Sequence, residues 1–215
     1  MWRARGGQTL LEGIIAIFVV TVGLMAVIGL AISNNTNAQL NNNRVIATTL
    51  AREGLEVVKH VRDSNWLAGA PFSQGLLVGD DGVTPLTSNI AVPQSTFDNN
   101  APVWNLDFSG VDYSDLTNDT TVVSWLETVG QQRFAQVPGG LSGTATKFHR
   151  NLTFTALCQA STARGTSFAY SNSNNNGNTC ASGVLIGIKV ISKVQWQQAL
   201  GPRSVILELR LFDWR

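Results

Sequence analysis

The stretch GQTLLEGIIAIFVVTVGLMAVIGLAI, residues 7–32, decides the fold of this chain. From Gly13 to Ile32 it carries no charged side chain, and nearly every residue is apolar. Those 20 residues span about 30 Å as a helix, which matches the hydrocarbon core of a bilayer. The stretch therefore predicts one membrane-spanning helical segment at 13–32.

The charges before this segment predict its orientation. Arg3 and Arg5 precede it, and the first acid of the chain is Glu12. By the positive-inside rule the N-terminal end stays cytoplasmic, and the rest of the chain lies on the outer side. A cleaved secretory signal is an alternative, but its apolar region is shorter and ends at a small-residue site. Here the polar residues 33–36 follow instead. A plain signal anchor remains the stronger alternative.

The helical pattern continues beyond the apolar segment. Residues 33–43 are rich in Asn, so the local helix propensity is low there. Between Arg44 and Val61, apolar residues again recur at helical spacing, with charged residues between them. Turn-forming residues at 63–65 and 69–71 indicate the end of the helix. We therefore expect one long helix over residues 8–66, apolar all round at first and amphipathic later.

The positive and negative charges of the chain are nearly balanced. The chain of 215 residues has 15 basic and 14 acidic side chains, and the net charge is +1. Only 13% of the residues are charged, which leaves a polar but largely uncharged surface. Nothing in this balance argues for nucleic acid or an acidic substrate.

The remaining residues predict an antiparallel sheet. Residues 69–143 are rich in turns, with short possible strands at 76–78 and 120–126. Apolar residues alternate with others over most of 147–157 and throughout 184–196 and 204–214, as strands with one buried face require. A Ser/Asn/Gly-rich loop is expected at 159–179.

The last two of these strands are expected to form a hairpin. A turn through 197–203 joins them. Pairing Trp196 with Val205 brings the two apolar faces to the same side. It also sets Lys193 opposite Glu208, a favourable cross-strand pair.

The expected fold class is thus α+β. Residues 1–7 form a leader, residues 8–66 the long helix, and residues 67–215 a β-rich domain outside the membrane.

A specific string precedes the apolar run: Gly7-Gln8-Thr9-Leu10-Leu11-Glu12. A glycine, a Thr-Leu pair, an acid and an uninterrupted apolar helix follow one another in this order. In these features the first quarter of the chain resembles the class III signal of type IV prepilins and pseudopilins.

The resemblance implies a processing step and an assembly residue. In this family a prepilin peptidase cuts after the glycine, and the new N-terminus is usually methylated. Here the cut would follow Gly7, and Gln8 would become the first residue. Glu12 then falls at the fifth position, where the family's acid pairs with the N-terminal amine of a neighbouring subunit. The implied partners are the prepilin peptidase, other pilin subunits and the inner-membrane assembly platform.

The resemblance also implies a location and a role. The protein would span the inner (cytoplasmic) membrane once before assembly and belong to an extracellular filament afterwards. Three departures favour a minor pilin or pseudopilin over a major pilin: Gln8 replaces an aromatic residue, Gly13 follows the acid, and the apolar helix lacks proline. We expect a structural subunit of a type IV pilus or a related secretion or DNA-uptake filament. Neither enzymatic activity nor a cofactor is expected.

Physical arguments support this interpretation and offer one alternative. Gly7 leaves the chain unobstructed, as a cleavage site requires. An acid within a spanning segment costs about 2.5–3.5 kcal/mol at the helix centre and less near its ends, which suggests a partner for Glu12. Alternatively, Glu12 is stabilised by the helix dipole because it lies near the N-terminus of the helix.

Cys158 and Cys180 are the only cysteines. Their even number and their expected place outside the cytoplasm favour a disulfide, and two free thiols are the alternative. A bridge would close the Ser/Asn-rich loop and contribute about 3 kcal/mol. Two cysteines with no nearby histidine do not form a complete metal site.

Other candidate residues carry weaker signals. His60 and His149 are isolated, and no metalloprotease or hydrolase motif surrounds them. The Asp/Asn clusters at 80–81, 98–100 and 112–119 offer oxygen ligands for calcium but lack EF-hand spacing, and such clusters are typical of turns.

The tryptophans are expected to lie mainly in the core. Trp196 and Trp214 lie on expected strands, where they pack against or cap the sheet. Trp66, Trp104 and Trp125 belong to the core or to a carbohydrate-facing surface, and the core is favoured.

Two functions of other classes stay open. A single-pass anchored extracellular adhesin or binding domain would leave the Gly7–Gln8 bond uncut and tolerate Glu12→Val. A secreted or anchored enzyme would need a clustered acid, base or metal site in the folded domain.

Overall fold

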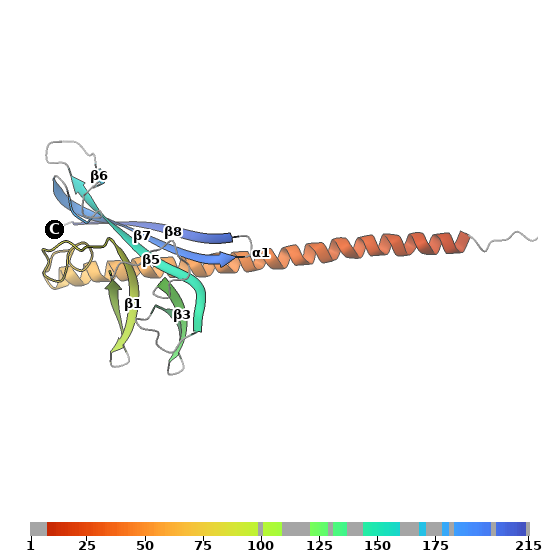
Figure 1. Ribbon diagram of the computed structural model, residues 1–215, viewed down its shortest axis with the longest axis horizontal. Coiled ribbons are helices and arrows are strands. Elements are labelled where there is room, and N and C mark those ends of the chain that lie inside the picture. The colour runs from red at the N-terminus through yellow and green to blue at the C-terminus, as the bar shows by residue number, and fades with distance from the viewer. Residues whose placement is uncertain are drawn as a thin grey trace, which may run out of the picture. The chain divides into compact units, whose positions relative to one another are not determined.

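In the part of the chain that the structure describes, one helix leads into a set of antiparallel strands (Figure 1). The structure is a computed structural model that describes residues 8–98, 101–108, 121–128, 131–136, 144–159, 168–170, 178–180, 183–198 and 201–213. The chain divides into two compact units, Met1–Val45 and Ile46–Arg215. The expected α+β class is confirmed at this level, as a long N-terminal apolar helix followed by an antiparallel sheet.

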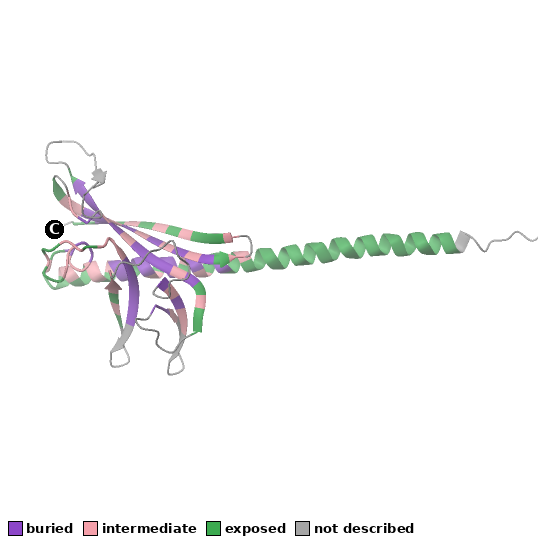
Figure 2. Ribbon diagram, in the orientation of Figure 1, coloured by how far each residue is buried: buried purple, intermediate pink, exposed green. Residues whose placement is uncertain are grey.

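Helix α1 (Gln8–Leu67) contains 60 residues. In the first unit its side chains are almost all exposed, as Figure 2 shows by their green colour. The helix continues through the Asn-rich residues 33–43. Each Asn or Thr there makes the free energy of helix formation less favourable than Ala by at most about 0.7 kcal/mol, which is too little to end the helix. The Thr36 hydroxyl donates to the Ile32 and Ser33 carbonyls at 2.9 and 2.8 Å. Within the described residues, α1 is the one helix long and apolar enough to cross a membrane.

In the second unit, residues 46–67 of α1 pack against the sheet. The buried positions follow helical spacing along one face: Ala47, Leu50, Ala51, Leu55, Val57 and Val58. Gly54 lies on this face. A Cβ added there would lie 3.0 Å from Leu152 Cδ2 and 3.1 Å from Ser192 Oγ. The absence of a side chain at Gly54 therefore lets the helix approach the two central strands closely.

Three long antiparallel strands form the centre of the sheet: β5 (Thr144–Gln159), β7 (Val184–Gln198) and β8 (Gly201–Phe212). β7 lies between the other two. The other edge of β5 pairs in turn with β3, β1 and β6. The expected strands at 147–157 and 184–196 are confirmed within β5 and β7. Most of the strand expected at 204–214 is confirmed by β8, and Trp214 lies outside the described residues.

Two shorter hairpins and one short strand complete the sheet. Strands β1 (Ile90–Asp98) and β2 (Ala101–Asp107) form one hairpin, and β3 (Val122–Thr128) and β4 (Gln131–Ala135) form the other. Strand β6 (Phe168–Tyr170) lies within the segment expected to be a loop. The strand expected at 120–126 is confirmed from Val122 onward. The strand expected at 76–78 is wrong: Leu76 and Leu77 are buried in a turn, and Val78 forms only isolated bridges.

The predicted register of the last hairpin is wrong by two residues. Val205 pairs with Val194, whereas Trp196 pairs with Arg203. Both strands extend further into the connection than expected, because β7 continues to Gln198 and β8 begins at Gly201. A shift of two residues keeps the same faces together, so the apolar side was predicted correctly.

The shift also changes the expected charge pair. Lys193 lies opposite Ile206, and Glu208 lies opposite Ile191. Glu208 instead accepts a hydrogen bond from Arg210 on its own strand at 2.8 Å. Pro202 is tolerated within β8 because this strand pairs on one side only among the described strands.

Among the described residues, two groups of buried side chains form the core, with members from α1, the sheet and the loop that follows α1. One group centres on Val58, Phe154 and Ile188, and the other on Leu50, Phe148 and Trp196. Trp196 is buried as expected. Trp66, Trp104 and Trp125 are only partly buried, so their favoured assignment to the core holds in part.

Candidate functional site

The N-terminal string is only partly described. Gly7 lies outside the described residues, and Gln8 begins α1 with no described side-chain position. Glu12 lies within the first two turns, and its side chain is exposed. Around it, the large apolar side chains from Leu10 to Ile32 are between 52% and 74% exposed. This arrangement presents one carboxylate at the start of a long uncovered apolar surface.

The expected disulfide between Cys158 and Cys180 is confirmed. It joins the end of β5 to the segment that precedes β7, with the two Cα atoms 5.7 Å apart. Asn178, which is buried, donates to the carbonyls of Leu86 and Ser88 at 2.8 and 3.0 Å. The bridge and these hydrogen bonds therefore attach residues 178–180 to both the sheet and the loop at 86–88.

A buried arginine connects the helix to the sheet. Arg150 is fully buried on β5; its Nε donates to Gln136 Oε1 at 2.8 Å, and its Nη1 donates to the Leu50 carbonyl at 3.0 Å. Its Nη1 also lies 3.4 Å from Glu53 Oε2. Burial lowers the pKa of the Arg150 guanidinium, and Glu53 acts in the opposite direction. These contacts indicate a structural role for Arg150.

The Gln136 side chain completes this network. Its Nε2 donates to the Thr121 and Arg150 carbonyls at 2.7 and 2.9 Å. This network was not predicted from the sequence. One signal for it was present in the sequence: Arg150 lies between Phe148 and Leu152 on the alternating strand, at a position that faces the core.

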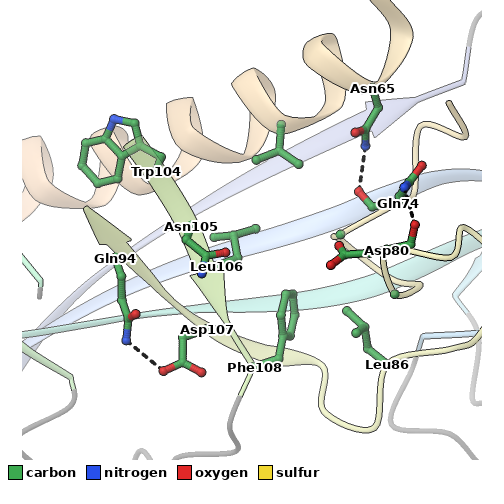
Figure 3. A pocket seen from close by; sticks show the side chains of 13 residues that line it. Asn65, Gln74, Asp80, Leu86, Gln94, Trp104, Asn105, Leu106, Asp107 and Phe108 are labelled. Carbon is green, nitrogen blue, oxygen red and sulfur yellow. Dashed lines mark hydrogen bonds between the residues drawn. The ribbon is translucent and has the colours of Figure 1, made fainter. Parts of the chain in front are cut away.

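A pocket of about 490 Å³ lies beside the C-terminal end of α1 (Figure 3). The end of α1, the loop at 68–89, β1, β2 and the residue after β2 supply its walls. The apolar part of the lining consists of Val61, Leu86, Trp104, Leu106 and Phe108. The polar side chains of the lining are Asn65, Gln74, Asp80, Gln94, Asn105 and Asp107. The volume lies in the range of small-ligand sites, although the lining is more polar than usual.

Three hydrogen bonds hold the polar wall in place. Asn65 Nδ2 donates to the Gln74 carbonyl at 2.7 Å, and Gln74 Nε2 donates to the Asp80 carbonyl at 2.6 Å. Gln94 Nε2 donates to Asp107 Oδ2 at 2.8 Å. Figure 3 shows these three contacts as dashed lines. The pocket was not predicted from the sequence, because its walls come from elements separated along the chain.

The Asp80–Asp81 pair lies in a turn, where the Asp81 carboxylate is bound by its neighbours. Asp81 Oδ1 accepts hydrogen bonds from the backbone amides of Val83 and Thr84 at 2.9 and 2.8 Å, and the Thr84 hydroxyl contacts Oδ2. These contacts, the hydroxyl first, lower the pKa of Asp81. Asp81 therefore stabilises a turn. No group of three potential His, Cys, Asp or Glu ligands occurs in the described part of the chain.

The remaining candidates have no shared site in the described structure. His149 Nδ1 lies 2.9 Å from the Thr121 hydroxyl, and His60 is exposed on α1. The clusters at 98–100 and 112–119 lie outside the described side chains.

Comparison with protein-family models, curated proteins and solved structures found no match.

Proposed function

We propose that this chain is a minor pilin or pseudopilin, a structural subunit of a type IV pilus or a related secretion or DNA-uptake filament. The string from Gly7 to Glu12, followed directly by an exposed apolar helix, is the observation that carries the proposal. The prepilin peptidase would cut after Gly7. The chain would then wait in the inner membrane until the assembly platform adds it to a filament.

The exposed surface of α1 supports assembly through this helix. Apolar side chains on all its sides are uncovered in the described structure from Leu10 to Ile32. Exposed apolar surface of this extent marks a membrane or protein interface. Lipid covers it before assembly, and the helices of neighbouring subunits cover it in the filament.

Glu12 gives this interface a fixed axial register. A carboxylate within an apolar bundle is costly unless it has a charged partner. Cleavage after Gly7 creates such a partner, the amine of Gln8 on a neighbouring subunit. Because the pairing joins one position on each helix, it selects one axial offset between subunits.

Two substitutions test this mechanism separately. Gly7→Arg should block cleavage, so the chain keeps residues 1–7 and stays in the membrane. Glu12→Val should still be cut but should fail to enter filaments, whereas the matched Glu12→Asp should retain partial assembly. Cleavage and entry into filaments are both measured by immunoblotting of the membrane fraction and of the sheared filament fraction. Normal incorporation of Glu12→Val would exclude the proposed pairing.

An anchored extracellular binding domain is a second candidate, and the pocket beside α1 favours it. In that case α1 serves only as an anchor, the Gly7–Gln8 bond stays intact, and Glu12→Val has no effect on function.

A further inference from the structure

We propose that the pocket beside α1 binds a neutral carbohydrate. The lining residues of this pocket of about 490 Å³ all belong to the second unit, and the inference does not depend on the filament role. Three properties of the lining carry it: the polar groups that are free to bond a ligand, the charge, and the aromatic rings.

The polar side chains of the lining leave both donors and acceptors for a ligand. Asn105 is exposed, and in the described structure its side-chain amide makes no hydrogen bond. It therefore offers both an NH₂ group and an oxygen. Asn65 and Gln74 each use the NH₂ group to donate to a backbone carbonyl, which leaves their amide oxygens as acceptors. A ligand that suits these groups both donates and accepts hydrogen bonds.

Hydroxyl groups meet this requirement better than charged groups do. Each hydroxyl is a donor and an acceptor, whereas an ammonium or a guanidinium only donates and would leave the Asn105 NH₂ group unmatched. Anionic ligands are disfavoured by charge, because Asp80 lies in the lining and the described lining residues include no Lys, Arg or His. The lining thus favours an uncharged ligand with several hydroxyl groups.

The aromatic rings provide the apolar part of the site. Trp104 on β2 and Phe108 directly after β2 both line the pocket (Figure 3). Phe108 also packs against Phe154, with the ring centroids 5.4 Å apart, whereas Trp104 has no ring contact in the described structure. The face of an aromatic ring is electron-rich and attracts the weakly positive C–H groups on the face of a sugar ring. Trp104 is therefore the expected stacking surface.

The arrangement of these groups favours a sugar over an extended peptide. A peptide also donates and accepts, but it presents these groups along a line. Here the free groups come from α1, the loop and β2, so they surround the cavity. A sugar ring carries hydroxyl groups around its edge and C–H groups on its faces, which matches polar walls beside an aromatic one.

Saturation-transfer NMR tests the proposal on the full chain in micelles of a detergent without a sugar headgroup. The neutral probes are maltotriose, cellotriose, triacetylchitotriose and lactose, and 3′-sialyllactose is the anionic counterpart of lactose. We expect at least one neutral probe to bind. The sialylated sugar should not bind at the same concentration, because its carboxylate finds no cation in the lining.

Matched variants locate the binding site. Trp104→Ala should weaken binding of the sugar about tenfold, through the loss of stacking, and Trp104→Phe should restore part of it. The control Trp125→Ala makes the same change on β3, at a partly buried tryptophan that does not line the pocket, and should leave the affinity within about twofold. Asn105→Ala, at an exposed position, should also weaken binding, and thermal unfolding checks that each variant is folded.

Three outcomes would overturn the proposal. Failure of all four neutral sugars to bind would exclude a carbohydrate site. Binding that survives both Trp104→Ala and Asn105→Ala would place the sugar outside this pocket. Binding of the capped peptide Ac-Ala-Ala-Ala-amide, lost in Trp104→Ala and without binding of any sugar, would assign the pocket to a polypeptide.

Discussion

The close approach of α1 to the sheet at Gly54 predicts a large effect of a small side chain. A Cβ at this position would already lie 3.0 Å from Leu152 Cδ2, 3.1 Å from Ser192 Oγ and 3.5 Å from Arg150 Cδ. Gly54→Val adds two further methyl groups beside this Cβ. We expect overpacking to cost about 3 kcal/mol, at the upper end of the usual range, because Leu152 and Ser192 are fully buried.

The difference in helix propensity between Gly and Val raises the free energy of unfolding, but this effect is smaller than the loss from overpacking. Replacing Gly by Val within a helix gains about 0.3–0.5 kcal/mol. The net loss should therefore be about 2–3 kcal/mol in the free energy of unfolding. Urea unfolding of the full chain in detergent measures it, with tryptophan fluorescence as the signal because Trp196 is buried in the core of the domain.

A matched substitution controls for the change in residue type. Gly23 also lies in α1, but apart from the adjacent helix backbone no atom of the described residues lies within 4 Å of a Cβ added there. Gly23→Val should leave the unfolding of the domain unchanged. A loss below about 0.5 kcal/mol for Gly54→Val would refute the close packing of helix and sheet, since that is the range of ordinary surface substitutions.

Three further predictions concern the β-rich domain. Arg150→Met should reduce the free energy of unfolding by about 2–4 kcal/mol, because Gln136 Oε1 and the Leu50 carbonyl lose their donor. Urea unfolding measures this loss. A variant as stable as the original protein would contradict the prediction. Replacing both Cys158 and Cys180 by Ala should cost about 3 kcal/mol through loop entropy, and reduction of the unchanged protein should have the same effect in the same assay. The lowered pKa of Asp81 means that its contribution to the turn is present above the ordinary value of 3.8 and is lost as pH falls through the lower folded value. An NMR titration of the Val83 and Thr84 amides should therefore show a midpoint below 3.8, and a midpoint at or above that value would contradict the assignment.

The sequence predicted the elements whose side chains follow a regular period. The helix end was predicted at residue 66 and lies at Leu67, and the apolar faces of β5, β7 and β8 were predicted correctly. Period alone does not determine register. The predicted pairing of Trp196 with Val205 and the observed pairing of Val194 with Val205 bring the same apolar faces together. The length of the turn decides between these two registers.

The features that were missed depend on contacts between distant segments. Arg150 meets Leu50 and Gln136 only in the folded domain, and neither partner is near it in the sequence. The pocket likewise joins Asn65 to residues of β1 and β2 that are about 30 to 40 positions away. Local patterns carry no information about such contacts, since each segment alone is consistent with many arrangements. The cysteine pair was predictable because only one intramolecular pairing exists for two cysteines.

The central claim is that the chain is processed between Gly7 and Gln8 before it enters a filament. The most direct test is the N-terminal sequence and intact mass of the protein, purified from cells that contain a prepilin peptidase. The proposal predicts a chain that begins at Gln8, with or without one added methyl group. A chain that keeps residues 1–7, or one cut after the apolar segment near residue 33, would contradict it and favour an anchored or secreted binding domain.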